Sequence, residues 1–356
     1  MLVILTFLAI LHVSSALQSK PSVLIVQNKG GGHGSIGYEL CKSIKRSKPE
    51  YDIHVIQDKC NYKTVPFSSY SELKALGVNV IDTSLGDADA CAKLAAELSS
   101  KKFDFVVDNW SKGVDNAKFC LDIAKKTGVS QYVFISSAGM YKSNPLAPLV
   151  ETDAVKTNDP RKVEIEVTSS GIPFTFLRPQ YIYGSMSNKR YLDYFIGRSL
   201  RKLPVPLPTH GEQLVCLTHL EDVADFIATA IGHKNAVNEI FNCGTDRYIS
   251  YKGLAKLINA EVGNAEEDAR FVHYDPDQFP HWDGKGVQEF PFRKETFVTA
   301  PSKAKHLLGW APKHSLLADL QAEVVEYRRA GGADEKWTGE ETKYDAEVIA
   351  AKKASA

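Results

Sequence analysis

Six short apolar runs recur along the first half of the chain, and most segments between them have the periodicity of amphipathic helices. Each run has four or five residues rich in β-branched or aromatic side chains, as expected for a strand buried on both faces of a sheet. The runs are residues 23–26, 53–56, 78–81, 103–107, 132–135 and 174–177. Because alternating strands and helices pair through right-handed crossovers, the pattern predicts a doubly wound α/β fold with a parallel sheet.

One of the intervening helices is well defined by its ends. Residues 113–126 carry apolar side chains at helical spacing, with Lys125 and Lys126 in the last turn and Gly128 just beyond it. Cations near the last carbonyls and a glycine stop are typical of a helix C-terminus. We therefore expect this helix to end at Gly128.

The pattern changes after Tyr181, where prolines cluster at positions 204, 206 and 208. Two further strand-like runs and two further helical segments follow, which predicts a smaller C-terminal subdomain of the substrate-binding type. The expected organisation is a nucleotide-binding core over residues 22–180, a subdomain over 181–330 interleaved with the last core strands, and a peripheral charged tail over 331–356.

The turn after the first apolar run is rich in glycine. Gly31, Gly34 and Gly37 form a G-x-x-G-x-x-G pattern between that strand and the next helix. The first glycine permits a tight turn, the second lets the backbone approach a pyrophosphate, and the third lets the helix pack on the strand. The free N–H groups of the helix then point at the phosphates. The pattern predicts a Rossmann fold that binds a nucleotide.

Two acidic residues follow the next two strands. Asp58 lies twenty-one residues past Gly37, where an acid accepts hydrogen bonds from an adenosine ribose and favours NAD over NADP. Asp87 ends the third strand region, where an adenine contact would lie. Both are candidate cofactor ligands, and for both the alternative is a solvated aspartate in a loop.

The N-terminus has the composition of a targeting leader. Residues 2–13 are almost entirely apolar and are followed by Ser14, Ser15 and Ala16, which predicts a signal peptide over residues 1–16. This run is too short to span a bilayer, and no later stretch could cross one. Residues 17–21 are polar and free of acids, like a short transit segment, so one interpretation is a two-part leader to the plastid stroma. The alternative is a secreted or lumenal protein.

Composition limits the remaining function classes. Lys and Arg number 43, as do Asp and Glu, so there is no basic excess of the kind that nucleic-acid-binding proteins often have. Any RNA contact would use a local basic patch. The six cysteines are scattered without metal-ligand spacing and are interpreted as buried thiols, with disulfides as the alternative.

Segments 135–141, 176–184, 219–224 and 239–244 resemble the extended short-chain dehydrogenase, or epimerase/dehydratase, superfamily. That resemblance implies proton transfer by Ser, Tyr and Lys, with Tyr four residues before Lys. Ser137 fits the serine and Lys162 fits the lysine, but the tyrosine position is Asn158. An amide cannot transfer a proton near neutral pH, and Pro160 changes how the helix begins. We therefore expect no standard dehydrogenase chemistry.

A second set of segments resembles one group within this superfamily, the chloroplast stem-loop binding proteins. They are residues 107–109, 134–142, 178–181, 240–243, 272–276, 292–293 and 307–310. The resemblance implies a plastid protein that binds stem-loop or ribosomal RNA and acts in transcript stability or processing. It also implies divalent-metal-dependent endoribonuclease activity, with Mg²⁺ as the metal, and a homo-oligomer or ribosome-associated complex. NAD or NADP would then be a vestigial cofactor.

Basic clusters offer candidate RNA contacts. Arg198, Arg201 and Lys202 are interleaved with the aromatic residues Tyr191 and Tyr194. Cations meet phosphates and rings stack on unpaired bases, although aromatics at helical spacing also suit a core or a dimer interface. No spacing in the chain requires a metal site for a nuclease.

Two other functions remain open from the sequence. The glycine turn with Ser137 and Lys162 is also compatible with an NAD(P)-dependent epimerase or dehydratase that acts on a sugar nucleotide and has a relocated proton donor. The third interpretation is a scaffold that senses nucleotide occupancy and assembles with partners.

Overall fold

The computed structural model describes residues 20–27, 35–58, 70–185, 187, 189–279, 289–337, 339, 342, 345–346 and 348. The predicted signal peptide and residues 17–19 of the predicted transit segment lie outside these residues. No described helix is both long enough and apolar enough to cross a membrane.

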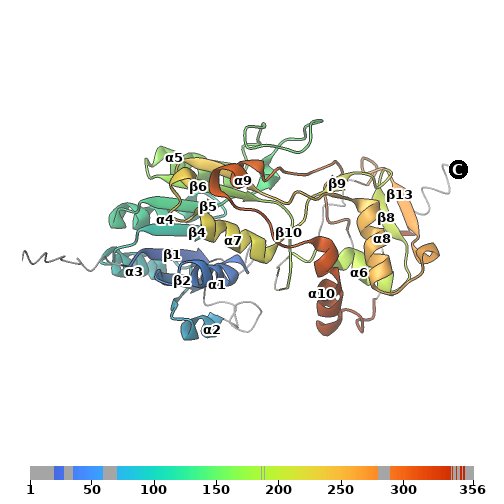
Figure 1. The fold of residues 1–356 in the computed structure, drawn as a ribbon, viewed down its shortest axis with the longest axis horizontal. Coiled ribbons are helices and arrows are strands. Elements are labelled where there is room, and N and C mark those ends of the chain that lie inside the picture. Colours follow the sequence, from blue (N-terminus) through green and yellow to red (C-terminus); the bar gives the residue numbers. More distant parts are fainter. Residues whose placement is uncertain are drawn as a thin grey trace, which may run out of the picture.

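A seven-stranded parallel sheet forms the core at the left of Figure 1. Its order is β11-β6-β5-β4-β1-β2-β3, so the first strand lies centrally and the chain winds outward in both directions. The strands are β1 (Ser22–Gln27), β2 (Asp52–Asp58), β3 (Asn79–Thr83), β4 (Phe105–Asn109), β5 (Gln131–Ile135), β6 (Phe174–Pro179) and β11 (Glu239–Cys243). All six strands predicted from the apolar runs are present, and the doubly wound fold is confirmed.

Helices cover both faces of the sheet. One face packs against α1 (Ile36–Ser47), α2 (Tyr70–Ala75), α7 (Leu220–Ala230) and α9 (Ser302–Leu308). The other packs against α3 (Ala88–Ser99), α4 (Val114–Thr127) and α5 (Asp159–Ser169). Helix α4 ends at Gly128, whose φ of 65° is the left-handed conformation that glycine adopts most readily. The predicted C-terminus of this helix is therefore confirmed.

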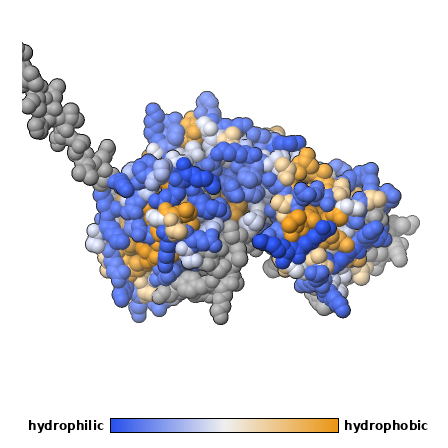
Figure 2. All heavy atoms as spheres, turned by 60° about the horizontal axis from the view of Figure 1, so that its bottom comes forward, coloured by the Kyte–Doolittle hydropathy of each residue, from blue (hydrophilic) through white to orange (hydrophobic). Residues whose placement is uncertain are grey.

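The smaller subdomain lies at the right of Figure 1 and has a core of its own, rich in aromatic rings. Its helices are α6 (Asp193–Leu200), α8 (Tyr251–Glu261) and α10 (Leu316–Arg329). Short strand pairs support them: β7 (Ile182–Tyr183) with β10 (Thr218–His219), β8 (Val205–Pro208) with β13 (Phe271–Tyr274), and β9 (Leu214–Val215) with β12 (Ile249–Ser250). Figure 2 shows apolar areas on both parts of an otherwise largely hydrophilic face.

Part of the segment predicted as a peripheral tail is packed into this subdomain. The side chains of Asp345 and Val348 are buried, and the ring of Trp337 lies 4.4 Å from the Arg201 guanidinium. The prediction of a peripheral position is therefore wrong for these residues, because they cover α6.

The cysteines bear out the reduced-thiol interpretation where they are described. Cys41, Cys120, Cys216 and Cys243 are buried free thiols, whereas Cys91 is a free thiol that is only half-buried. Burial raises the pKa of Cys216 to about 11, because a thiolate is poorly solvated there. Cys60 lies outside the described residues.

Candidate functional site

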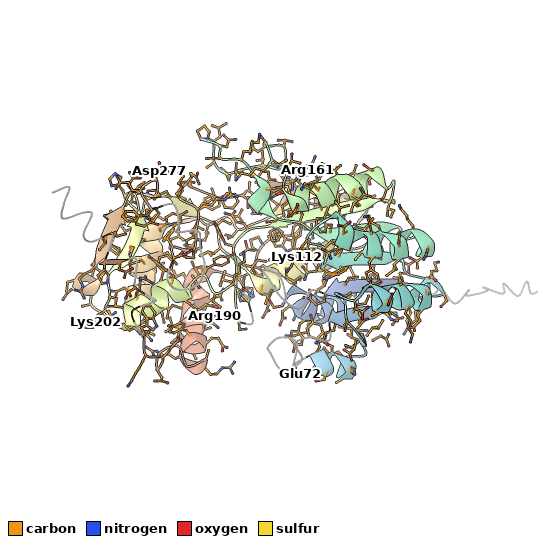
Figure 3. All side chains as sticks on the ribbon, turned by 180° about the vertical axis from the view of Figure 1, so that it is seen from behind. Glu72, Lys112, Arg161, Arg190, Lys202 and Asp277 are labelled. Carbon is orange, nitrogen blue, oxygen red and sulfur yellow. The ribbon has the colours of Figure 1, made fainter. Side chains whose placement is uncertain are left out.

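A cavity of about 360 Å³ opens at the carboxyl ends of β4, β5 and β6, beside the C-terminal subdomain. In a doubly wound sheet this edge is where ligands bind, since the loops diverge there. Side chains from both parts of the molecule line the cavity, and Figure 3 shows Lys112 where the core meets the subdomain. The cavity is the strongest candidate for a functional site.

The charges that line this cavity are all positive. Lys112, Lys189 and Arg293 contribute cations, and no aspartate or glutamate is among the described lining residues. The two lysines are exposed at the cavity mouth, and neither forms an ion pair within the described part of the chain. Since the whole chain has no net charge, this is a local concentration of positive potential that favours an anion.

The guanidinium of Arg293 is held in place by neutral groups. Nη1 donates to the Tyr141 carbonyl at 3.2 Å, and Nη2 donates to the Gly139 carbonyl at 2.5 Å. The guanidinium also lies 3.8 Å from the centre of the Phe297 ring. Because no carboxylate is among these partners, the positive charge is fixed in position without being neutralised.

Aromatic rings form much of the cavity wall. Trp110, Tyr181 and Tyr191 line it, and the two tyrosine rings meet edge to face at 5.1 Å. The Tyr181 hydroxyl accepts a hydrogen bond from the Arg293 backbone N–H at 3.0 Å. Burial raises the pKa of Tyr181 to about 12, so its phenol stays protonated at neutral pH. The walls thus supply ring surfaces rather than a proton acceptor.

The three positions that correspond to the proton-transfer residues of the superfamily do not form one group in the structure. Ser137 lines the cavity, and its Oγ accepts from the Gly139 N–H at 3.0 Å. Lys162 is exposed, pairs with Asp159 at 3.0 Å and is absent from the cavity lining. Asn158 caps α5 by accepting from the Arg161 N–H at 3.2 Å. The serine therefore faces the cavity, whereas the other two positions serve the start of a helix.

Tyr141 is buried behind the cavity in a hydrogen-bond network. Its hydroxyl donates to Asn242 Oδ1 at 2.7 Å and accepts from Arg178 Nη1 at 3.0 Å. Burial raises the pKa of Tyr141 to about 12, although Arg178 acts in the opposite direction. The Tyr141 hydroxyl thus makes both of these hydrogen bonds within the protein, and Tyr141 is not among the described residues that line the cavity.

The third glycine of the turn makes the close helix–strand approach that its spacing predicts. A Cβ at Gly37 would lie 2.1 Å from Gln27 Oε1, so a larger residue there would displace the Gln27 amide. The same Oε1 accepts from the Gly37 N–H at 2.8 Å and from Asn109 Nδ2 at 2.9 Å. One N–H at the start of α1 is therefore already bonded by the protein. Gly31 and Gly34 lie outside the described residues.

The two aspartates predicted near the ribose and adenine lie at the ends of their elements. Asp58 is the last residue of β2, in register with Thr83 of β3. Asp87 caps α3, with Oδ1 accepting from the N–H groups of Asp89 and Ala90 at 2.9 and 3.2 Å. The structure thus gives Asp87 a local role in helix capping.

A second cavity, of about 350 Å³, lies between α3 and α4. Leu85 and Gly86, from the end of the third strand region, line it, and Trp110 lines both this cavity and the first. A dinucleotide bound along the sheet edge would extend from one cavity to the other. Trp110 therefore lies at the boundary between the two cavities.

The structure corrects the candidate RNA-binding cluster. The side chain of Arg198 is fully buried and pairs with Asp345 at 3.0 Å, and its guanidinium lies 4.1 Å from the Tyr194 ring centre. Arg201 is half-buried and bonds to the backbone carbonyls of Gly332 and Glu335. Only Lys202 is exposed. The two arginines thus hold the C-terminal segment on α6 rather than presenting a surface for phosphates.

Sequence reasoning did not find the residues that do form a cationic site. Lys112, Lys189 and Arg293 come from three loops far apart in the chain. Trp110 was the one cavity residue that the local sequence could have indicated. It follows the fourth strand directly, and a bulky ring at that position alters the shape of the binding edge of the sheet.

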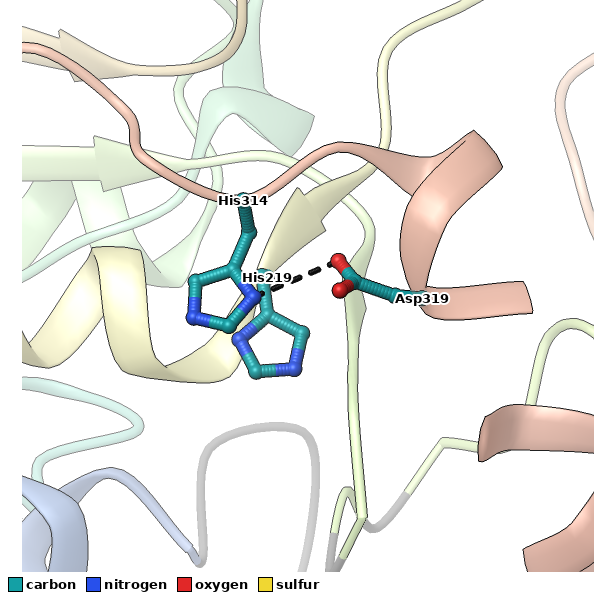
Figure 4. A group of neighbouring side chains, drawn as sticks. All are labelled: His219, His314 and Asp319. Carbon is teal, nitrogen blue, oxygen red and sulfur yellow. Dashed lines mark hydrogen bonds and ion pairs between the residues drawn. The ribbon is translucent and has the colours of Figure 1, made fainter. Parts of the chain in front are cut away.

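A cluster of metal-ligand types lies away from the cavity (Figure 4). His219, His314 and Asp319 place one potential ligand atom each within 4.8 Å of the others. However, the two imidazole rings are stacked, with centroids 3.6 Å apart and planes 16° apart. Nitrogen lone pairs lie in the ring plane, so one ion cannot lie in the plane of both rings. The arrangement suits a stacking contact between the residue that caps α7 and the segment that leads into α10.

This stacked pair makes the stability of the fold depend on pH. Burial, then the neighbouring His314, lowers the pKa of His219 from 6.5 to about 4. Below pH 6.5 the unfolded chain therefore binds a proton at His219 that the native state does not bind. The free energy of unfolding is expected to fall between pH 6.5 and 4. We expect the loss from this residue to reach roughly 2–3 kcal/mol at pH 4.

Replacing His219 with Asn keeps a capping side chain for α7 and removes the titrating group. Urea unfolding at pH 7 and pH 4.5 should show a smaller loss of stability for the variant than for the wild type. His233, a half-buried histidine that caps a short 3₁₀ helix, supplies the matched control variant H233N. Equal pH dependence of H219N and the wild type would contradict the assignment.

Comparison with known proteins places this geometry in a family. The model of the NAD dependent epimerase/dehydratase family matches residues 30–244. The chloroplast stem-loop binding protein of 41 kDa b, from Arabidopsis thaliana, is 30% identical over 314 residues, which cover 87% of this chain and 79% of that protein.

Solved structures agree with the fold. UDP-glucose 4-epimerase from Thermotoga maritima, solved with UDP-glucose, has a TM-score of 0.64 and 20% identity, covering 87% of this chain and 99% of its own. dTDP-glucose 4,6-dehydratase from Bacillus anthracis, in complex with NAD, has a TM-score of 0.68 and 17% identity, covering 87% and 97%. At these identities the likeness concerns the fold alone. The chain belongs to the NAD dependent epimerase/dehydratase family and, within it, to the family of the chloroplast stem-loop binding proteins.

Proposed function

We propose that this chain is a plastid RNA-binding protein that uses the cavity at the carboxyl ends of β4–β6 to bind RNA. The observation that carries the proposal is the set of three cations in that cavity, Lys112, Lys189 and Arg293, with no acidic residue among the described lining residues. Cations without carboxylate partners release counterions when they meet phosphates, which is the main source of affinity for RNA. The relative from Arabidopsis thaliana is a chloroplast stem-loop binding protein, which supports both the stem-loop partner and the chloroplast location.

The proposal includes the loss of short-chain dehydrogenase chemistry. Asn158 stands where the proton-donating tyrosine would be, and it caps α5. Lys162, whose charge would lower the pKa of such a tyrosine, pairs instead with Asp159 outside the cavity. The cavity can therefore bind an anion and a planar ring, but it has no paired acid and base for proton transfer.

The charge of the cavity mouth gives the direct test. We expect the double variant K112E/K189E to bind a stem-loop RNA at least about tenfold more weakly than the wild type, with a salt dependence reduced by about two phosphate contacts. The control variant K125E/K126E makes the same change in net charge at the C-terminal end of α4, which lies at the amino ends of the strands, away from the cavity. Filter binding across a salt series measures both.

No binding by the wild type, or equal losses in the two double variants, would overturn the proposal.

The same assay with and without Mg²⁺ tests the nuclease component, since a metal-dependent endoribonuclease shortens the RNA during the incubation. Among the described residues, no group of three carboxylates lies close enough together to hold Mg²⁺.

The family match also favours a second candidate, an NAD(P)-dependent epimerase or dehydratase that acts on a sugar nucleotide. NAD would supply hydride transfer when bound, with Ser137 nearby and Gly37 at the turn. We expect NAD to bind weakly to the wild type, because the bulky side chain of Trp110 lines both of the cavities that a dinucleotide would span. Trp110→Ala removes that ring and should tighten NAD binding about tenfold, or ~1.4 kcal/mol. Isothermal titration of both proteins with NAD measures this, and tight NAD binding by the wild type would contradict the expectation.

A further inference from the structure

We propose that the cavity accepts one unpaired nucleotide of the RNA, turned out of the helical stack, rather than a paired segment. This inference rests on the proposed function and specifies the form of RNA that the site recognises. It follows from the size of the cavity, the positions of its cations and the surfaces of its walls.

The size of the cavity sets the first limit. A volume of about 360 Å³ is at the small end of the range for sites that hold a single small molecule. An RNA duplex, roughly 20 Å across, cannot enter it, and the deep, narrow major groove of A-form RNA hides the base edges. A single nucleotide of a loop or bulge can enter, because its base has no partner to leave.

The cations lie at two levels. Lys112 and Lys189 are exposed at the mouth, whereas Arg293 is half-buried and fixed by the carbonyls of Gly139 and Tyr141. A nucleotide that enters base first keeps its flanking phosphates at the mouth, within reach of the two flexible lysines. Arg293 then lies deeper, where its fixed N–H groups meet the nucleotide itself rather than the backbone on either side.

The walls suit a base. Trp110 and Tyr191 are half-buried rings in the cavity lining, and an unpaired base stacks on such rings whatever its identity. Ser137 uses an oxygen lone pair to accept from the Gly139 N–H, so its hydroxyl proton stays available for a base edge. A base inside a duplex cannot use these groups, since its faces and edges are already engaged.

The test compares two RNAs with the full chain: a hairpin with an unpaired loop and a blunt duplex of equal phosphate number. We expect the hairpin to bind at least about tenfold more tightly. A 2-aminopurine placed in the loop should change in fluorescence on binding, and one placed in the stem should not. Tyr191→Ala should weaken hairpin binding by about tenfold and leave duplex binding unchanged. Tyr248→Ala, a half-buried tyrosine that lines a different pocket, is the matched control.

The outcomes separate this inference from the function on which it rests. Equal affinity for hairpin and duplex, or a loop 2-aminopurine that does not respond in the wild type, overturns the single-nucleotide site while RNA binding stands. Absence of binding to either RNA overturns the proposed function itself. The fluorescence measurement uses only the wild-type protein. It therefore still tests the inference if the Y191A variant does not fold.

Discussion

Replacing Glu164 with Gln is expected to destabilise the protein by about 3–5 kcal/mol, because it leaves a buried arginine without its counter-charge. Glu164 is fully buried in α5 and accepts two hydrogen bonds from Arg178, from Nε at 3.0 Å and from Nη2 at 2.8 Å. It also accepts from the Ser136 hydroxyl at 2.8 Å. Arg178 itself is only 2% exposed, so water cannot replace the lost carboxylate.

The same carboxylate supplies a matched control. Arg161 also contacts Glu164 Oε2 at 2.8 Å, but its side chain is 32% exposed. Removing Arg161 leaves Glu164 paired with Arg178, so Arg161→Ala should cost no more than about 1 kcal/mol. Urea denaturation of the three proteins gives the comparison. Similar losses for E164Q and R161A would show that the buried pair does not dominate the network.

Asp345→Asn is expected to destabilise the protein by about 1.5–3 kcal/mol, because the variant loses a buried, charge-assisted hydrogen bond to Arg198. Its carboxylate pairs at 3.0 Å with Arg198, whose side chain is fully buried beside the Tyr194 and Trp337 rings. Gly197 allows this packing, since a Cβ there would lie 2.6 Å from Trp337. The variant should therefore both lower the unfolding midpoint and expose the C-terminal segment to protease.

Glu335 offers the control for this prediction. Its backbone N–H donates to the Gly331 carbonyl and its own carbonyl accepts from Arg201, whereas its side chain is exposed. Glu335→Ala should change stability by less than about 0.5 kcal/mol. Thermal unfolding and limited trypsin digestion distinguish the two variants, and an unaltered D345N protein would show that the segment contributes little to the fold.

Much of the fold follows from local pattern. Strands buried on both faces of a sheet need continuous apolar runs, so β1 to β6 are visible in the sequence, and Gly128 marks the end of α4 through its own conformation. The close approach at Gly37 likewise follows from glycine spacing beside a strand. These features depend on neighbours within a few residues.

The site was less predictable because it depends on contacts between distant segments. Lys112, Lys189 and Arg293 meet only once the subdomain packs against the sheet edge. For the arginines of α6, the sequence suggested a surface cluster that the structure shows to be buried or half-buried. The prediction failed because a basic cluster on a helix is ordinarily solvated. The spacing held one clue: Arg198 lies four residues after Tyr194, which places both on one face of α6, and that face is covered by the C-terminal segment.

The position of β11 has a consequence for how the chain is made. The sheet takes its edge strand from Glu239–Cys243, and one of its faces is covered by α7, which comes shortly before that strand in the chain, and by α9, which comes about sixty residues after it. The apolar surfaces of α1 and β1 therefore stay uncovered while the first two thirds of the polypeptide leave the ribosome or a translocation channel. This face of the core can therefore close only once α9 has been synthesised, and until then its apolar surface is open to wrong contacts.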